Sequence, residues 1–153
     1  MKAVIQRVSF AKVIADGILT GEIGQGYMIL LGVVEDDTEA HARLMAEKVA
    51  YLRIFTDEND KMNLSLLDVK GAALVVSNFT LCADTSHGRR PNFIGAKKPI
   101  EANKLYEMFM DELRKQGVSK VESGVFGADM KVSIENDGPV TILLNTDDWK
   151  MKA

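Results

Sequence analysis

The sequence predicts an α/β fold in which a mixed, barrel-like β-sheet carries two main α-helices packed outside it. Apolar runs with strand character alternate with two segments that repeat apolar residues at helical spacing. Along the chain, a group of strands followed by a helix occurs roughly twice. The simplest architecture that accommodates this order is one sheet covered by the helices. A chain of 153 residues fits a single domain, which we place at residues 1–146, followed by a short C-terminal tail at 147–153.

The first thirty-odd residues alternate strand-like runs with glycine-containing turns. Residues 2–15 are rich in valine, isoleucine and alanine, and form one strand or two strands broken near Ser9. Asp16-Gly17 is typical of a tight hairpin turn that leads into a strand at 18–23. After a second turn, residues 27–34 are nearly all apolar, as in a central strand covered on both faces. Together these runs predict a β-meander.

An amphipathic helix follows the third strand. Residues 36–39 supply candidates for its N-cap and negative charge for its first turn. Apolar residues then recur at helical spacing, at Ala42, Met45, Ala46, Val49 and Leu52. His41 falls on the polar side of the first turns, so we interpret it as solvated surface rather than as a catalytic base.

The second strongly apolar run covers residues 72–81, after a short strand at 53–56 and an extended piece at 62–67. It ends in hydroxyl groups, those of Ser77 and Thr80, at a place where sheet proteins often expose functional groups. In a regular strand these two side chains would face opposite ways, so they share a pocket only if the strand breaks there. A strand end that merely reaches water and a catalytic segment both remain open from this pattern.

Residues 82–98 show no helical or strand period, and a loop of this length is usually functional or disordered. Phe93 and Ile94 can anchor it, so we predict a functional loop. Its neighbourhood also forms a local basic patch, made of His87, Arg89, Arg90, Lys97 and Lys98. This patch could contact a few phosphates with modest, salt-sensitive affinity, or could be a solvated loop with charges by chance.

A second helix begins at Pro99 and ends at Gly117, with Ala102, Leu105, Tyr106, Phe109 and Leu113 on its buried face. Short strands are predicted at 118–122, 130–134 and 140–144. The residues from Asp147 onward contain Trp149 but no pattern, and we expect them to be loosely held.

Composition and charge exclude several classes of function. A formal net charge of −3 disfavours a general nucleic-acid binder, and we expect no DNA partner. The N-terminus has no secretory signal and the longest apolar stretch is too short to span a bilayer, so we expect no membrane association. The single cysteine, Cys82, cannot form an internal disulfide and fits a reducing cytoplasm.

Several kinds of catalytic site are also missing from the sequence pattern. No closely spaced set of His, Cys, Asp and Glu matches a metal site, and no glycine-rich loop matches a nucleotide fingerprint. We therefore expect no metal and no cofactor. A Ser-His-Asp triad would need His41 or His87 as its base, and nothing in the sequence places either beside a nucleophile.

The most constrained backbone lies in Asn136-Asp137-Gly138-Pro139-Val140-Thr141, between the last two predicted strands. Gly138 can adopt dihedral angles closed to other residues, whereas Pro139 fixes its own φ and has no N–H to donate. The ordinary interpretation is a turn between two strands. The alternative is a rigid recognition element that presents the Gly138 carbonyl.

This stretch, taken with Ser77-Asn78-Phe79-Thr80-Leu81, resembles the paired signature motifs of the D-aminoacyl-tRNA deacylases. The resemblance covers nearly the whole chain, since the segments at 3–8, 62–69, 88–91 and 126–130 also look like that family. It implies a homodimeric hydrolase that cleaves the ester joining a D-amino acid to the 3′-terminal adenosine of tRNA. It further implies a cis peptide at Gly138-Pro139 that reaches from one subunit into the active site of the other.

The resemblance also assigns roles to individual residues. The Gly138 carbonyl would hold the amino group of the substrate and leave no room for an L side chain, so glycyl-tRNA should also be a substrate. Arg7 would fix the Gly138-Pro139 loop, and Phe126 and Met130 would pack against the terminal adenine.

By the same resemblance, the catalytic candidates are Ser77, Phe79 and Thr80, and the backbone N–H groups of Phe79 and Thr80 would form an oxyanion hole. We favour assistance by the ribose 2′-OH of the substrate over Thr80 as a nucleophile, because no base is placed to activate that hydroxyl. Asn78 departs from the family, which usually has glutamine there, so we assign it no role.

Two other classes of function compete with the deacylase. One is a module that binds tRNA ends or nucleotides without turnover, through Arg89, Arg90, Lys97 and Lys98. The other is an esterase for small acyl substrates that forms an acyl-enzyme on Thr80 or Ser77.

Overall fold

A computed structural model describes residues 1–151 of the chain. The elements in chain order are β1 (Lys2–Ala15), β2 (Ile18–Ile23), β3 (Gly26–Gly32), α1 (Glu39–Tyr51), β4 (Phe55–Thr56), β5 (Met62–Leu64), β6 (Ala72–Ser77), the 3-10 helix η1 (Phe79–Cys82), α2 (Pro99–Gln116), β7 (Val121–Ser123), β8 (Met130–Asn145) and the 3-10 helix η2 (Thr146–Asp148). Strands β4 and β5 form a small separate sheet, and the others form the main sheet.

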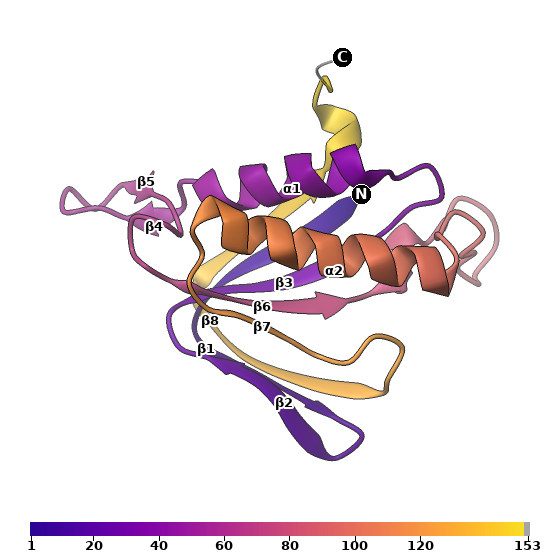
Figure 1. The fold of residues 1–153 in the computed structure, drawn as a ribbon, viewed down its shortest axis with the longest axis horizontal. Helices are drawn as coiled ribbons and strands as arrows, with labels where there is room; N and C mark the ends of the chain where they lie inside the picture. The colour runs from indigo at the N-terminus through magenta and orange to yellow at the C-terminus, as the bar shows by residue number, and fades with distance from the viewer. Residues whose placement is uncertain (152–153) are drawn as a thin grey trace.

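The main sheet mixes antiparallel pairs with the parallel pairs β3–β6 and β6–β7. Its lower part curls so that β2 and β7 approach each other, and α1 and α2 lie side by side over the other part (Figure 1). The predicted α/β class, with a mixed, barrel-like sheet and two outer helices, is confirmed.

Strand β1 organises this sheet, because β8 pairs along one of its edges while β2 and β3 follow one another along the other. Ala11 lies opposite Ile23 and Val8 lies opposite Gly26, so the register is unchanged across the two residues between β2 and β3. The predicted β-meander is therefore wrong. Strand β3 pairs with β1 rather than with β2, because β1 is long enough to hold both.

Strand β8 runs without interruption, and the strands predicted at 130–134 and 140–144 are its two halves. Both halves pair with β1 in the same direction, but Gln6 faces Thr141 whereas Val8 faces Asn136. Residues 137–140 are therefore left opposite the single residue between Gln6 and Val8. The predicted turn between two strands is wrong: the chain keeps its direction and forms a wide bulge.

Apolar residues gather in two clusters, one on each face of the sheet. The larger lies between the sheet and the helices and includes the fully buried Ile5, Ile29 and Phe109. The smaller fills the curled part and includes Val13 and Leu74. The predicted buried face of α2 is confirmed, since all five of its named residues are buried.

The helix ends also follow the sequence closely. The Thr38 N–H donates to Nδ1 of His41 at 3.0 Å, so His41 is a half-buried capping residue rather than freely solvated surface. Pro99 occupies the first turn of α2, and Gly117 ends that helix with a φ of 111°. Among residues 1–151 no helix is long and apolar enough to cross a membrane.

The C-terminal tail, which starts at residue 147, begins within η2, and its Trp149 is held more firmly than expected. Trp149 is partly buried against the larger cluster, and Nζ of Lys48 lies 5.3 Å from the centre of its ring. The expectation of a loosely held tail is therefore wrong at Trp149. The last two residues of the predicted tail, 152 and 153, lie outside the described part of the chain.

Candidate active site

Strand β6 ends at Ser77, where Asn78 caps the short helix η1. The side-chain oxygen of Asn78 accepts hydrogen bonds from the Thr80 N–H, at 3.2 Å, and from the Thr80 hydroxyl. The Leu81 N–H donates to the Asn78 carbonyl at 3.3 Å. The strand therefore ends before Phe79 and Thr80. Their side chains no longer have to point to opposite faces of the sheet, as they would in a regular strand.

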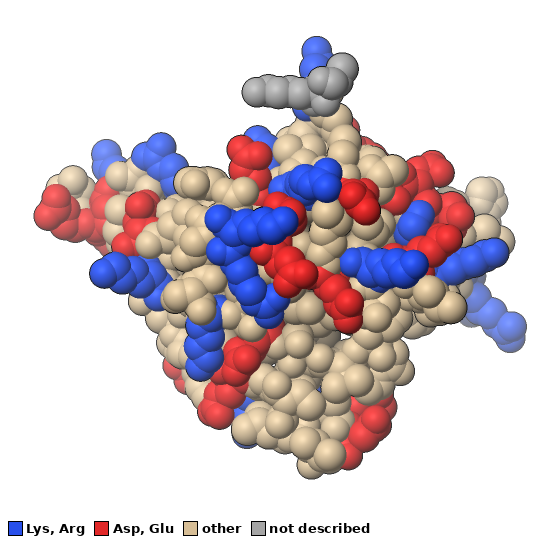
Figure 2. Space-filling model, in the orientation of Figure 1, with Lys and Arg blue, Asp and Glu red and all other residues tan. Residues whose placement is uncertain are grey.

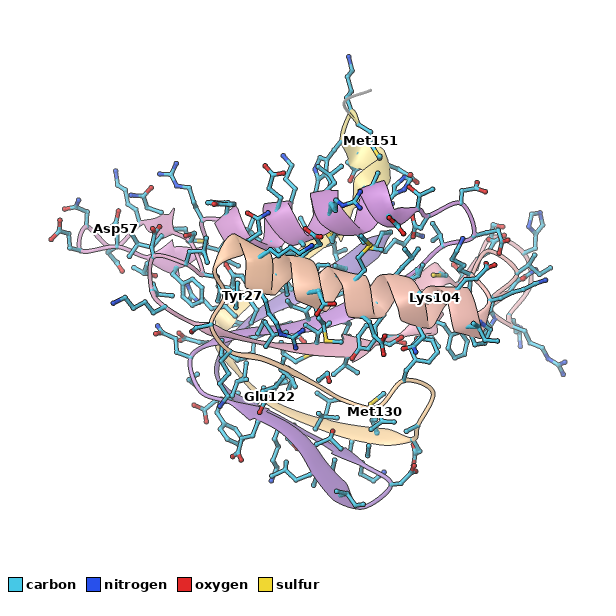
Figure 3. The ribbon with its side chains drawn as sticks, viewed as in Figure 1. Tyr27, Asp57, Lys104, Glu122, Met130 and Met151 are labelled. Carbon is cyan, nitrogen blue, oxygen red and sulfur yellow. The ribbon has the colours of Figure 1, made fainter. Side chains whose placement is uncertain are left out.

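A cavity of about 750 Å³ opens beside this break. Ser77 and Phe79 line it from β6 and η1, Phe126 lines it from the turn after β7, and Met130 lines it from the start of β8. Figure 3 labels Met130 and shows the start of β8 below the N-terminal half of α2. The fold thus brings together four of the predicted site residues from three parts of the chain.

The wall of this cavity offers little acid–base chemistry. It is mainly apolar, its charged members are Lys97 and Lys98, and no Asp, Glu or His of the described residues lines it. No group of His, Cys, Asp and Glu within residues 1–151 could hold a metal ion. Such a wall suits a flat apolar or aromatic group fixed by a few polar contacts.

Two titratable groups near the cavity stay protonated at neutral pH. The Tyr106 hydroxyl donates to the Val75 carbonyl at 2.8 Å, and burial raises the pKa of Tyr106 to about 12. Burial also raises the pKa of the Cys82 thiol, whose Sγ lies 3.4 Å from the Val33 carbonyl oxygen. Neither group is prepared to act as a base or as a nucleophile.

The two predicted oxyanion donors differ in their availability. The Phe79 N–H has no hydrogen-bond partner in the described part of the chain, whereas the Thr80 N–H donates to Asn78. Thr80 does not itself line the cavity. In this arrangement only the Phe79 N–H is free, and the Thr80 N–H becomes free if the Asn78 side chain turns away.

The long loop between η1 and α2 borders the cavity through an aromatic contact. The ring of Phe93 lies edge-to-face against that of Phe79, with centroids 5.1 Å apart, although the Phe79 residue stays 58% exposed. Phe93 therefore anchors the loop as predicted. Ile94 does not, because it is 84% exposed.

Arg7 occupies the space beneath the bulge in β8. Its Nε donates to the Asp137 carbonyl at 2.9 Å and its Nη1 donates to the Ile54 carbonyl at 2.7 Å, while the residue is only 8% exposed. Asn136 closes the bulge, since its side-chain oxygen accepts the Val140 N–H at 2.8 Å. Side chains therefore hold the bulge where the β-ladder is interrupted.

Gly138 and Pro139 form the exposed crest of this bulge, and the peptide bond between them is cis, as expected. Gly138 has a φ of +137°, and a Cβ there would lie 2.7 Å from Cγ2 of Val140. Glycine is therefore required at this position. We call Gly138-Pro139 the crest.

The predicted site residues fall into two groups that do not meet within one chain. Neither the crest nor Arg7 lines the cavity. Arg7 connects the crest to Ile54, just before β4, and Figure 1 shows β4 at the opposite end of the molecule from the loop between η1 and α2.

Sequence reasoning missed residues in both groups. Asn136 holds the bulge, and an asparagine beside a turn-like stretch is a recognisable signal because its side chain often bonds the nearby backbone. Leu30 and Val132 line the cavity, but they carry no signal because they resemble ordinary strand residues.

Known proteins resemble this chain over nearly its whole length. The family model described as D-Tyr-tRNA(Tyr) deacylase matches residues 4–145. Proteins named D-aminoacyl-tRNA deacylase from Clostridium beijerinckii and Thermus aquaticus are 56% and 55% identical to it. Each alignment covers 95% of this chain, with 97% and 95% of the relative.

Solved structures show the same likeness. One described as c-Myc DNA Unwinding Element Binding Protein has a TM-score of 0.89 and 40% identity, and covers 95% of this chain and 98% of its own. One described as a probable eukaryotic D-amino acid tRNA deacylase has a TM-score of 0.80 and 18% identity, with 94% and 97% covered. The second likeness concerns the fold alone.

Proposed function

The chain belongs to the D-aminoacyl-tRNA deacylase family and is a hydrolase, and from this premise we propose that it removes D-amino acids and glycine from the 3′-terminal adenosine of tRNA while rejecting L-amino acids. One observation carries this proposal. A mainly apolar cavity, lined by no Asp, Glu or His of the described residues, and the exposed crest that could screen its contents lie on separate surfaces of one chain.

The cavity is suited to the terminal adenosine. Its volume of about 750 Å³ falls within the range of small-molecule sites. Phe126 and Met130 offer an aromatic face and a polarisable thioether, and both suit the flat surface of an adenine. The adenosine would then present its esterified 3′-oxygen toward η1.

Hydrolysis then depends on backbone donors and on the substrate itself. Water attacks the ester carbonyl, the carbonyl oxygen becomes an oxyanion near the Phe79 N–H, and the bond to the ribose 3′-oxygen breaks as that oxygen takes a proton. One such donor contributes roughly 3 kcal/mol in comparable enzymes. The neighbouring 2′-OH of the ribose assists the step, because no Asp, Glu or His of the described residues lines the cavity.

A second copy of the chain would bring a crest to each cavity. Strand β8 pairs with β1 alone among the described strands, so its outer edge is unpaired. On the sheet face away from the helices, Leu143 is 77% exposed beside a hollow of about 410 Å³ that Val4 and Leu81 also line. An open strand edge and an uncovered apolar face both favour pairing with another copy. We therefore infer a homodimer.

Selectivity would arise by exclusion. The partner's Gly138 carbonyl would accept a hydrogen bond from the amino group of the substrate and would leave no space for an L side chain. A D side chain points the other way, and glycine has none, so both are accepted. We place this reaction in the cytoplasm, where the tRNA pool is used.

The test is to incubate the pure protein with D-tyrosyl-tRNA, L-tyrosyl-tRNA and glycyl-tRNA and to measure release of the amino acid. We expect release from the D and glycyl forms at least about a hundredfold faster than from the L form. Equal rates for the D and L forms would contradict exclusion by the crest and would favour an acyl-enzyme esterase. Binding without release would instead favour a tRNA-end binding module.

A further inference from the structure

The loop that borders the cavity has a fixed base and an exposed tip. Asp84 and Asn92 exchange backbone hydrogen bonds of 2.7 and 2.9 Å, so the tip at residues 85–91 is closed like a hairpin. Farther along, the Lys97 N–H donates to the Val33 carbonyl at 3.0 Å, and the Gly95 carbonyl accepts from Glu35 at 2.9 Å. The loop is therefore tied to the end of β3 and holds its tip away from the core.

The tip carries two arginines whose guanidinium groups are unengaged. Arg89 and Arg90 are exposed and make no hydrogen bond or ion pair within residues 1–151. The other four arginines each bond a protein group, and these are Arg7, Arg43, Arg53 and Arg114. Two adjacent arginines that the fold does not use are available to an external anion, and a guanidinium binds phosphate well.

The charge of this loop continues from its tip to the cavity. Between Asp84 and Glu101 the sequence has no acidic residue. The Asp84 carboxylate accepts the Ser86 N–H at 2.9 Å, so it serves the turn. Lys97 and Lys98 line the cavity, and Phe93 joins the loop to Phe79 at the cavity wall.

The charges over the two helices are mixed (Figure 2). On the face shown in Figure 2, acidic and basic side chains alternate over the helices without forming a large area of one sign. Figure 1 shows the loop projecting from the end of the molecule at which α2 begins. The cationic path from the loop tip to the cavity is thus a local feature of a chain with net charge −3.

We propose that this loop docks the phosphate backbone of the RNA strand whose last nucleotide enters the cavity, with Arg89 and Arg90 on phosphates before the terminal one. The proposal rests on the proposed function, because it requires a nucleotide in the cavity. It adds that the chain recognises RNA beyond the terminal adenosine, through charge and without reading bases. Phosphate contacts of this kind position a nucleic acid and make its binding salt-dependent.

The test uses the full-length protein with two substrates, D-tyrosyl-tRNA and D-tyrosyl-adenosine, the second of which has no phosphate. In the double variant Arg89→Ala/Arg90→Ala we expect KM for D-tyrosyl-tRNA to rise about tenfold with kcat nearly unchanged. The slope of log KM against log salt should fall by about 1.4, because two single-strand phosphate contacts are lost. Hydrolysis of D-tyrosyl-adenosine should not change.

The matched control is Lys61→Ala/Lys70→Ala, which removes the same charge from exposed sites outside the loop. An unchanged KM and salt slope in the arginine variant would overturn the proposal, as would an equal change in the control. A parallel loss with D-tyrosyl-adenosine would also overturn it, because it would place the arginines in the cavity chemistry. If the wild-type protein released amino acid from neither substrate, the proposed function itself would fail, which is a distinct result.

Discussion

The cavity and the crest are built in opposite ways. The cavity forms where β6 stops and where a turn and a loop leave the sheet, so one backbone donor there, the Phe79 N–H, is open to a ligand. The crest lies within a continuous strand, and the buried Arg7 holds it from below. One region is concave and offers chemistry, whereas the other is convex and offers a fixed shape. Under the proposed function, one chain carries both halves of a filter, and two chains would be needed to assemble it.

The most decisive test of this contrast is to disable the crest in one chain and the cavity in another. Gly138→Ala would force a Cβ to within 2.7 Å of Val140, and Ala128→Trp would fill the cavity from its wall. We expect each variant alone to lose about a hundredfold or more of D-tyrosyl-tRNA hydrolysis. Unfolding and refolding the two together should restore roughly a quarter of wild-type activity, because half of random dimers would contain one intact site.

If properly folded mixed dimers recover no activity, the crest does not act on the cavity of the other chain. It would then act on the cavity of its own chain or have no role in the reaction. A suitable control is Gly17→Ala, which also places a side chain at a positive φ, 83°, but in open space. That variant should keep its activity. This result would show that replacing a glycine at a positive φ does not by itself abolish hydrolysis.

The next largest effect should come from Arg7, which holds the crest from below. Arg7→Ala leaves the carbonyls of Asp137 and Ile54 without their donor in a mostly buried site. We expect the free energy of unfolding to fall by about 3 kcal/mol, measured by urea denaturation at fixed protein concentration. Stereoselectivity should weaken at the same time, since the crest loses its support.

Arg53→Ala is the matched control for that measurement. The Arg53 Nε also donates to a carbonyl, that of Asn63 at 2.8 Å, but the side chain is exposed. Its loss should cost less than about 1 kcal/mol. Equal costs for the two variants would show that the bulge does not depend on its buried arginine.

The smallest effect should come from Thr80, beside the cavity. Its hydroxyl already donates to Asn78, and the described cavity wall has no Asp, Glu or His that could activate it. We expect Thr80→Ala to lower kcat by less than about fivefold, whereas a substrate that ends in 2′-deoxyadenosine should not be hydrolysed. A folded Thr80→Ala protein that binds substrate but does not turn it over would make Thr80 the nucleophile.

Much of the local structure could be predicted from the sequence, because its signals are local. The hairpin at Asp16-Gly17, the start of α2 at Pro99 and its end at Gly117 each depend on the backbone preferences of a few neighbouring residues. The division of the predicted site residues could not be foreseen. A motif gives the order of residues along the chain but not which of them share a surface.

Two further errors have the same origin. The apolar side chain of Ile94 predicts an anchor for the loop, yet it is exposed, and Phe93 packs against Phe79 instead. The lack of a pattern around Trp149 predicts a loose tail, yet Trp149 packs against the core. In both places the outcome depends on a contact with a distant part of the chain.

The sequence by itself determined where most of the strands and helices lie, and its two motifs carry the resemblance to the family that the family model then matched. The tertiary structure decided that β3 pairs with β1, that β8 continues through the crest, and that the cavity and the crest lie apart. The physical reason is that a pattern of apolar residues predicts that a segment is a strand but does not specify which strand it pairs with. Long-range hydrogen bonds and burial choose that neighbour, and they exist only once the chain is folded.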